Sequence, residues 1–213
     1  MTRSILAVLA ATVSITVVAG TGCNSTGVGD PCTPEAEYSQ YFLGFADSEV
    51  NIESKSFQCQ TRLCLANHFQ GRVTCPYGQD INSSGAVIAP PGATSPCSTP
   101  IGEPVTGINP VTGVVDNPMV GATVSPECVD RTAADAVYCS CRCANIDGQT
   151  NDGANYCTCP SGFSCTQLVS SIGATDQNLA GAYCIKNGTE YSPGNSCLSF
   201  CDADLKNCGT LQL

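Results

Sequence analysis

Cysteine is the residue that most constrains this chain, because seventeen of its 213 residues are cysteines. A fraction of about 8% is close to the level that marks a disulfide-stabilised scaffold. Disulfides at this density persist outside the reducing cytosol, so the cysteine content predicts an exported protein. We expect a small disulfide-rich fold, mostly β-strands and loops, with one or two short helices and about eight disulfides.

The charge of the chain limits its partners. Eight Lys and Arg residues against eighteen Asp and Glu residues give a formal net charge of −10, and 12% of the residues are charged. Because a chain with so few cations cannot neutralise phosphates, nucleic acid is not an expected partner. The low charged fraction also argues against a coiled coil and against a charge-rich disordered chain.

Residues 1–22 have the pattern of a signal peptide. Arg3 provides a basic start, and an uncharged apolar stretch runs from Ile5 to Ala19. A stretch of about fifteen residues suits the apolar region of a signal peptide and is short for a membrane span. We therefore expect residues 1–22 to direct export and residues 23–31 to form a polar tether.

The leader closes with Gly20-Thr21-Gly22-Cys23. This run resembles the lipobox of bacterial lipoproteins, although that family prefers Leu where this chain has Gly20. The resemblance implies an acylated Cys23 and an outer-membrane or cell-surface protein. The odd number of cysteines agrees with acylation of Cys23, because an odd cysteine in an exported chain needs an explanation. The alternative is ordinary cleavage near Gly20 or Gly22, which would give a periplasmic or secreted protein.

The cysteines divide the mature chain into residues 32–80, residues 81–126 and residues 127–213. Parity predicts that the four cysteines of the first module pair internally and that Cys97 bridges into the last module, leaving two independent disulfide lobes. All the cysteines after Cys23 are expected to form disulfides: Cys32, Cys59, Cys64, Cys75, Cys97, Cys128, Cys139, Cys141, Cys143, Cys157, Cys159, Cys165, Cys184, Cys197, Cys201 and Cys208.

Local patterns predict several elements in the first module. Residues 34–43 are expected to form a short helix whose aromatic side chains face the core. Residues 50–53 alternate in polarity and predict a strand. Two short runs, residues 63–65 and 72–75, flank Gly71 and predict a hairpin with its loop around residues 67–71. The aromatic residues of the expected core stripe are Tyr38, Tyr41, Phe42 and Phe45.

Later segments give weaker patterns. Residues 81–126 are rich in proline, but their many valines favour short edge strands over a solvated linker, since sheet edges tolerate proline. Cys197, Cys201 and Cys208 recur at a helical period, which predicts a short helix over residues 195–209.

The run Cys139-Ser140-Cys141-Arg142-Cys143 is the most distinctive motif. On a strand, residues two apart have Cα atoms roughly 6.5–7 Å apart, which exceeds the usual disulfide separation of about 5.5–6 Å. Adjacent cysteines of the run should therefore pair with different segments and make this strand a hub. The alternative is a thiolate cluster for Zn or Cu(I), but C-x₂-C pairs are missing, so no metal or other cofactor is expected.

A second run, Cys157-Thr158-Cys159 followed by Gly162-Phe163 and Cys165, resembles a fragment of an EGF-like module. The fragment covers about ten residues and lacks the six-cysteine order of the family. The whole chain resembles the cysteine-rich secreted lipoproteins of bacteria, and that resemblance implies no particular activity.

Three other features invite a chemical interpretation. The loop from Asn145 to Asn155 is rich in oxygen ligands but lacks the EF-hand order, so a polar surface loop is expected rather than a calcium site. His68 would have to serve any Ser–His or Cys–His mechanism, and a structural role is expected for it. Arg62 lies between Cys59 and Cys64, where a protease inhibitor would present a basic residue on a rigid loop.

The sequence thus predicts a non-catalytic protein of the cell envelope, structural or interaction-mediating, with no catalytic residues assigned. Its expected partners are the membrane, through the lipid anchor, and envelope or extracellular proteins. The alternatives are a secreted enzyme or a protease inhibitor that presents Arg62. Clustered acids around a concave pocket would favour the enzyme, and an exposed apolar patch would favour the binding module.

Overall fold

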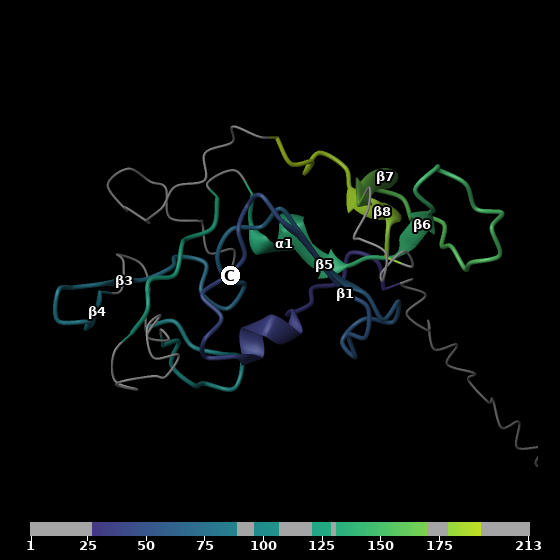
Figure 1. The fold of residues 1–213 in the computed structure, drawn as a ribbon. Coiled ribbons are helices and arrows are strands. Elements are labelled where there is room, and N and C mark those ends of the chain that lie inside the picture. Colours follow the sequence, from purple (N-terminus) through teal and green to yellow (C-terminus); the bar gives the residue numbers. More distant parts are fainter. Residues whose placement is uncertain (1–26, 89–95, 107–120, 129–130, 170–178, 193–213) are drawn as a thin grey trace, which may run out of the picture.

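The computed structural model describes residues 27–88, 96–106, 121–128, 131–169 and 179–192, in which short strands and loops dominate (Figure 1). The two helices within these ranges, a 3₁₀ turn η1 (Glu35–Tyr38) and an α-helix α1 (Ala133–Ala136), are one turn each. The expectation of a small, mostly β and loop, disulfide-rich fold is confirmed. The strands are β1 (Val50–Glu53), β2 (Cys64–Asn67), β3 (Asp80–Ile81), β4 (Val87–Ile88), β5 (Val137–Cys139), β6 (Arg142–Ala144), β7 (Phe163–Val169) and β8 (Gly181–Lys186).

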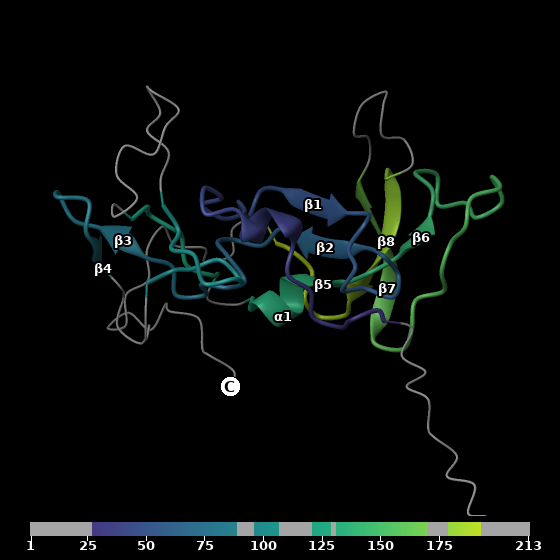
Figure 2. The same ribbon diagram turned by 90° about the horizontal axis from the view of Figure 1, so that it is seen from below.

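The strands form small antiparallel sheets. A central sheet has the order β1-β2-β5, a second sheet has the order β6-β8-β7, and β3 pairs with β4. Figure 2 shows the central sheet between the other two. The strand predicted over residues 50–53 is confirmed as β1, whose Ile52 lies opposite Leu65.

The predicted hairpin around Gly71 is wrong. Strand β2 pairs with β1 and β5, while residues 72–75 close a tight turn in which the Cys75 amide donates to the Arg72 carbonyl at 3.0 Å. Gly71 pairs instead with Phe45, and a Cβ atom at Gly71 would lie 2.3 Å from the Ser125 carbonyl oxygen. Contacts with distant segments therefore decide where this part of the chain turns.

The core lies on both faces of the central sheet, which explains why every residue of β2 is buried. On one face, Ala66 and Val137 pack in a cluster that includes the cysteines of two disulfides. On the other face, Leu65 and Tyr138 pack against Tyr183 of β8, so this second cluster joins the central sheet to its neighbour. Side chains that alternate along a strand point to opposite faces, as this division requires.

The aromatic stripe expected in residues 34–45 is only half correct. Phe45 is buried and stacks edge-on with Phe42 at 4.7 Å between ring centroids. Tyr38 and Tyr41 are 43% and 41% exposed. The helical period does not continue past the single 3₁₀ turn, because Ser39 is already extended, so the two tyrosines leave the core face.

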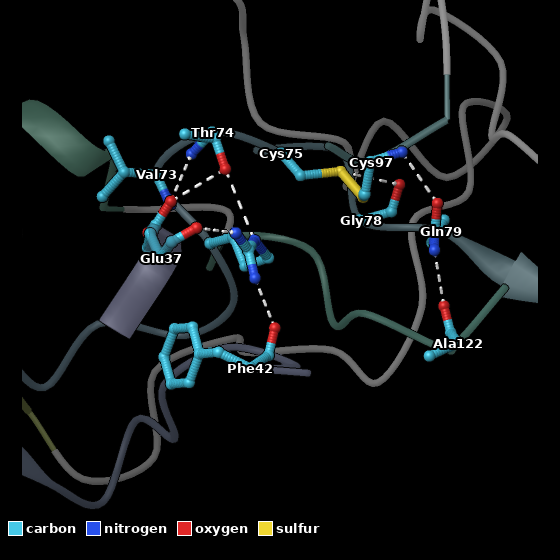
Figure 3. Close-up of a disulfide and its surroundings, with 10 residues drawn as sticks. Glu37, Phe42, Val73, Thr74, Cys75, Gly78, Gln79, Cys97 and Ala122 are labelled. Atoms are coloured by element: carbon cyan, nitrogen blue, oxygen red, sulfur yellow. Dashed lines mark hydrogen bonds between the residues drawn. A yellow bond between two sulfur atoms is a disulfide. The ribbon is translucent and has the colours of Figure 1, made fainter. Parts of the chain in front are cut away.

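A buried carboxylate and a buried guanidinium hold η1 to residues 72–74 through hydrogen bonds to the backbone. Glu37 and Arg72 are both fully buried. The Glu37 carboxylate accepts hydrogen bonds from the Val73 amide at 2.5 Å, from the Thr74 amide at 3.0 Å and from the Thr74 hydroxyl at 2.8 Å (Figure 3). The Arg72 guanidinium donates to the backbone carbonyls of Glu37 and Ser39. Burial lowers the pKa of Arg72, an effect that the nearby Glu37 charge opposes.

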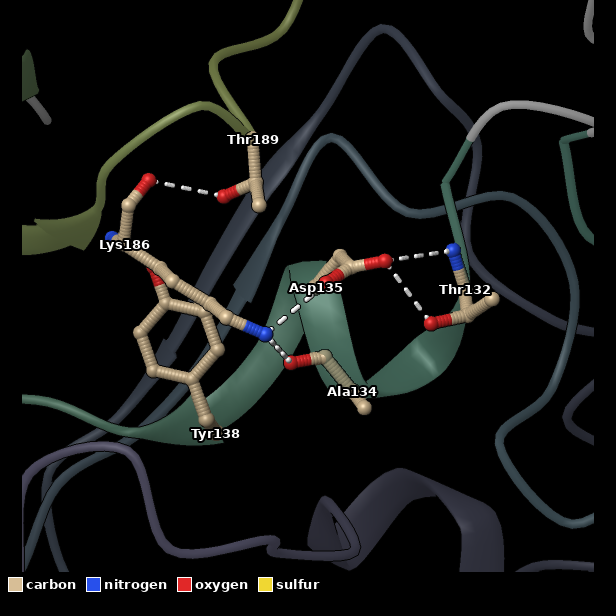
Figure 4. Close-up of polar contacts among 6 residues, drawn as sticks. All are labelled: Thr132, Ala134, Asp135, Tyr138, Lys186 and Thr189. Atoms are coloured by element: carbon tan, nitrogen blue, oxygen red, sulfur yellow. Dashed lines mark hydrogen bonds and ion pairs between the residues drawn. The ribbon is translucent and has the colours of Figure 1, made fainter. Parts of the chain in front are cut away.

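Lys186 joins the second sheet to α1. Its ammonium lies 2.9 Å from the Asp135 carboxylate, and its amide donates to the Tyr138 hydroxyl at 3.0 Å (Figure 4). Asp135 also accepts from the Thr132 hydroxyl in a capping box at the start of α1. Burial acts to raise the pKa of Asp135, but the hydrogen bonds from Lys186 and Thr132 hold it below its usual value. These contacts tie α1 to β8 of the second sheet.

Every cysteine in the described ranges is in a disulfide. This chemistry indicates an oxidising environment, extracellular or periplasmic. Within the described part of the chain, no helix has the length and apolar character of a membrane span. The described pairs are Cys32–Cys64, Cys59–Cys139, Cys75–Cys97, Cys141–Cys157, Cys143–Cys165 and Cys159–Cys184.

The predicted division into independent disulfide lobes is wrong. Cys59 of the first module pairs with Cys139 of the last module, so the first four cysteines do not pair internally. Cys97 pairs with Cys75 rather than with a cysteine of the last module. The number of cysteines in each module says nothing about which of them are close in space. The central sheet places β5 of the last module beside β2 of the first.

The prediction that adjacent cysteines of residues 139–143 have different partners is confirmed. The partners are Cys59, Cys157 and Cys165. The expected single strand is instead divided, because β5 ends at Cys139 and β6 begins at Arg142. The hub therefore connects two sheets, with one cysteine in the central sheet and two in or beside the second.

Several predictions concern segments that the structure describes in part or not at all. The leader, Cys23 and the helix expected over residues 195–209 lie outside the described residues. Short strands between residues 81 and 126 are present in the part described, as β4 and as isolated bridges such as that between Thr106 and Gly121. Val105 and Val124 are buried there, as expected of packed rather than solvated chain.

Candidate functional site

A half-open pocket of about 580 Å³ lies where η1 meets the end of β1. Its lining comes from Thr33, Glu35 and Tyr38 around η1, from Glu53 at the end of β1, and from residues 55–58 and Arg62 of the loop that follows. Ligand sites in proteins typically enclose about 300–1,000 Å³ and have few polar groups in fixed positions. The pocket has the size of such a site.

The walls of the pocket are tied to each other. The Gln58 side chain donates to the Thr33 carbonyl at 2.7 Å and accepts from the Thr33 amide at 3.0 Å. On the far side, the Glu35 amide donates to the Glu53 carboxylate at 2.8 Å. These hydrogen bonds close the ring of segments around the pocket without using the side chain of Glu35.

Two disulfides stand directly behind the same segments. Cys32 precedes Thr33 and pairs with Cys64, while Cys59 follows Gln58 and pairs with Cys139. The sulfur atoms of Cys32, Cys59 and Cys139 lie within 4.8 Å of one another, so the two disulfides pack together. A site held in this way is pre-organised, which reduces the ordering entropy that a ligand must overcome.

The loop of residues 55–62 presents an apolar side chain to solvent. Phe57 is 87% exposed, the largest value among the exposed large hydrophobic residues of the described chain. The Arg62 guanidinium lies over its ring at 4.4 Å from the centroid. The loop is closed by a hydrogen bond of 3.1 Å from the Ser56 amide to the Arg62 carbonyl. The pocket therefore has an aromatic and cationic rim on a fixed backbone.

The Ser56 hydroxyl is buried and has no hydrogen-bond partner among the described residues. Ser56 is 1% exposed, and its Oγ makes no hydrogen bond to any described residue. A buried hydroxyl left without a hydrogen bond costs about 1–3 kcal/mol. Unpaired buried polar atoms are rare in native structures, but the Ser56 Oγ has essentially no accessible surface, so it offers no contact to a ligand in the pocket.

The cations of the pocket are also without carboxylate partners among the described residues. The ion pair of the described chain joins Lys186 to Asp135, and neither Lys55 nor Arg62 has a carboxylate within 4.0 Å. The chain as a whole carries a net charge of −10. The pocket lining combines Lys55 and Arg62 with Glu35 and Glu53, so its formal charge is balanced although the chain as a whole is negative.

Arg62 is exposed, as expected of a residue presented at the surface. The small disulfide loop expected around it is not formed. Cys59 and Cys64 do not pair with each other, so no short disulfide loop presents this arginine. Arg62 instead adopts a left-handed backbone conformation with φ of 64°, beside Phe57. The premise of a loop like that of a protease inhibitor is wrong.

His68 has a structural environment. Its ring stacks on Tyr191 with centroids 4.1 Å apart, and its Nδ1 lies 2.8 Å from the Asp47 carbonyl oxygen. The Arg131 guanidinium donates to the His68 carbonyl at 2.9 Å. His68 does not line the pocket, so the pocket and the histidine do not form one site.

The oxygen-rich loop after Asn145 satisfies its own polar groups. The Asn145 side chain accepts from the amides of Asp147 and Gln149, at 3.0 and 2.7 Å. The Asp152 carboxylate accepts from Asn145 and from the Tyr156 hydroxyl, and the Tyr156 bond is the main reason that the pKa of Asp152 is lowered. These contacts agree with the predicted polar surface loop.

The densest sulfur cluster lies in the second sheet. The sulfur of Cys184 lies 3.6 Å from that of Cys141 and 3.7 Å from that of Cys157. Each of these atoms is already in a disulfide bond. Zn and Cu(I) bind thiolates, and a disulfide sulfur is not a thiolate, so the oxidised cluster acts as a covalent core.

The most strongly shifted carboxyl lies away from the pocket. Glu127 is 4% exposed, and burial raises its pKa to about 7, with smaller contributions from Asp135 and Glu37. It accepts a hydrogen bond of 3.2 Å from the Ala133 amide at the start of α1. Its contact is with the first turn of a helix, and we assign it a structural role.

The sequence did not indicate Ser56 and Phe57 as site residues. The available signal was a lone aromatic residue in the polar run Lys55-Ser56-Phe57-Gln58, immediately before a cysteine. The sequence does not predict whether this aromatic residue is buried or exposed, because the run lacks the hydrophobic periodicity that would define a buried face. Tyr38 was expected in the core and instead lines the pocket.

Comparison of the chain with protein-family models, with curated proteins and with solved structures finds no match. The chemistry of the pocket is therefore derived from its own residues.

Proposed function

We propose that this protein is a non-catalytic recognition protein of the cell envelope, which binds a ligand through the pocket between η1 and residues 55–62. The observation that carries the proposal is the exposed Phe57 ring, with Arg62 over it, at a pocket fixed by two disulfides. Rigid walls, an exposed aromatic ring and a few polar groups are typical of binding sites.

A recognition role accounts for the pocket better than catalysis does. His68 lies outside the pocket, and its ring contacts among the described residues are the stacked Tyr191 ring and the Asp47 carbonyl. Of the pocket carboxylates, Glu53 is hydrogen-bonded to the Glu35 amide.

Binding is tested by NMR titration of the ¹⁵N-labelled protein with short peptides, oligosaccharides and lipid headgroups. We expect one of these classes to shift the amides of residues 33–38 and 53–62 and to be recovered unchanged. Phe57→Ala should weaken that binding about tenfold, because exposed aromatic residues are frequent anchors of interfaces. Ile101→Ala is the matched control, since Ile101 is also an exposed apolar residue, at 67%, outside the pocket. Equal effects of the two substitutions, or turnover of the ligand, would contradict the proposal.

We further propose that a diacylglyceryl group on Cys23 anchors the protein to the membrane, with residues 23–31 as the tether. The proposal rests on the lipobox-like run ending at Cys23 and on the odd number of cysteines. Two acyl chains give stable anchoring, whereas one chain gives only marginal binding.

The anchor predicts the behaviour of Cys23→Ser in a bacterial host that processes lipoproteins. The unaltered protein should enter the detergent phase and incorporate labelled fatty acid, while Cys23→Ser should do neither, because serine has no thiol to acylate. Intact mass spectrometry provides the check on the mature protein. A variant that stays in the detergent phase with an unchanged mature mass would disprove the anchor.

A further inference from the structure

Two clusters of disulfides in the described chain differ in exposure. The first, which we call the core cluster, contains Cys32–Cys64 and Cys59–Cys139, and all four of its cysteines are buried. The second-sheet cluster contains three disulfides, and each joins a buried cysteine to one that is partly buried or exposed. These three disulfides are Cys141–Cys157, Cys143–Cys165 and Cys159–Cys184, in which Cys141, Cys143 and Cys184 are the buried members.

The disulfides of the second-sheet cluster lie close to one another through their sulfur atoms. The Cys184 sulfur lies 3.6 Å from that of Cys141 and 3.7 Å from that of Cys157. The Cys143 sulfur lies within 4.8 Å of the sulfurs of Cys159 and Cys184. Thiol–disulfide exchange proceeds by attack of a thiolate on a sulfur atom of a disulfide. A thiolate released at Cys143 or at Cys184 would therefore stand beside an intact disulfide of the cluster.

The register of the second sheet also allows an alternative pairing. Cys165 of β7 lies directly opposite Cys184 of β8, although each is bonded to another cysteine. Directly opposite residues of antiparallel strands have Cβ atoms about 4.5–5.5 Å apart, which is close to the spacing in a disulfide. The strands β6, β8 and β7 lie side by side in one sheet (Figure 2). Sulfur atoms of this cluster can therefore change partners while the sheet keeps its register.

Cys165 offers the way in from solvent. It is exposed, whereas every other described cysteine is buried or partly buried. Its partner Cys143 is 6% exposed, so a thiolate from solvent approaches this disulfide from the Cys165 side. Strand β7 contains no carboxylate that would repel a thiolate, and it lies at the edge of the described sheet. Exposed disulfides are typically the labile or catalytic ones of exported proteins.

We infer that the second-sheet cluster is a thiol–disulfide exchange relay that a thiol substrate enters at Cys165. The substrate thiolate attacks the Cys165 sulfur, forms a mixed disulfide there and releases Cys143 as a thiolate. The Cys143 thiolate attacks Cys159, bonds to it and releases Cys184.

The relay ends at Cys157. The Cys184 thiolate attacks Cys141 and releases Cys157, because the partly buried Cys157 is better solvated as a thiolate than the buried Cys141. Each step forms one S–S bond and breaks one, and the Cys157 thiolate takes a proton from water. When the substrate is a dithiol, its second thiolate attacks its own sulfur in the mixed disulfide and releases Cys165. The substrate then leaves as a disulfide, and the relay has gained two electrons and two protons, held as thiols at Cys157 and Cys165.

The first test exposes the folded full chain briefly to reduced glutathione at mildly alkaline pH, without denaturant. Free thiols are then blocked with N-ethylmaleimide, and both adducts are located by peptide mapping. We expect glutathione at Cys165 and N-ethylmaleimide beyond Cys143, chiefly at Cys157. N-ethylmaleimide at Cys143 alone would overturn the relay, and absence of glutathione from Cys165 would overturn its entry point.

The core cluster is the internal control of the same experiment. Its sulfur atoms are also close together, but its buried cysteines should gain label at least about tenfold more slowly, because exchange depends on access. Equal rates of labelling in the two clusters would mean that unfolding exposes the sulfur atoms, and would overturn the inference.

Dithiothreitol in place of glutathione tests the net reaction. A limiting amount should be oxidised and leave two thiols per reacted chain, both within the second-sheet cluster. Thiols in the core cluster in equal yield, or dithiothreitol retained as a mixed disulfide, would contradict electron uptake by the relay.

Removal of the middle disulfide tests the route. In a variant with Cys159→Ala and Cys184→Ala, glutathione should still reach Cys165, but the released thiol should stay at Cys143. The matched control replaces Cys75 and Cys97 by alanine, which removes a disulfide outside both clusters and should leave the spread of label unchanged. Label at Cys157 in the first variant would contradict the route. The map of the unaltered protein decides the existence of the relay without either variant.

Discussion

Replacement of Cys59 and Cys139 together by alanine is expected to lower the free energy of unfolding by about 4 kcal/mol. Their disulfide joins residues 80 apart in sequence and is the covalent link between the first module and β5. In the chain-entropy account, a crosslink stabilises a protein by restricting its unfolded chain, and it does so more strongly for longer loops. Chemical denaturation under non-reducing conditions measures the change.

The Cys75–Cys97 disulfide provides the comparison, because it spans only 22 residues. Its removal should cost about 3 kcal/mol. The two variants should also differ in which residues lose protection from hydrogen exchange. Hydrogen exchange should rise at residues 55–62 when Cys59 and Cys139 are replaced, since this link stands behind the pocket. Equal exchange at those residues in both variants would contradict the role of the Cys59–Cys139 link in holding the pocket.

Replacement of Glu37 by glutamine is expected to lower the free energy of unfolding by about 3 kcal/mol, because it leaves the buried Arg72 charge without its counter-charge. The new NH2 group would also face the amide of either Val73 or Thr74, each of which now donates to one oxygen of the carboxylate. Thermal and denaturant unfolding near neutral pH measure the loss.

Glu35→Gln is the matched control for this substitution, since it removes the same charge two residues away at an exposed position. Its effect should stay within about 0.5 kcal/mol, as for most surface substitutions. A similar loss of stability in both variants would mean that net charge, and not the buried pair, is responsible.

The proposed function uses the rigidity that these interactions provide. Glu37 lies in η1, which forms one wall of the pocket, and Cys59 anchors the loop that forms the other. The largest stabilising links of the first module thus converge on the two walls. A binding site held in this way keeps Phe57 exposed without letting its loop collapse onto the core.

The sequence by itself determined the class of the fold. Cysteine density, scarce charge and frequent prolines predicted a disulfide-rich protein of short strands, and the alternation of residues 50–53 predicted β1. The separation of Cα atoms along a strand was enough to predict that Cys139, Cys141 and Cys143 have different partners. Each of these inferences depends on composition or on geometry within a few residues, which the sequence carries directly.

Tertiary structure alone decided the rest, because the deciding contacts join residues far apart in the chain. Gly71 turns toward Phe45 and Ser125 instead of closing a hairpin, and Cys59 pairs with Cys139 instead of with a near neighbour. The pocket has the same origin. Thr33, Glu53 and Ser56 become its walls only when η1, β1 and the following loop are brought together, and no local pattern records that a hydroxyl will be buried there without a partner.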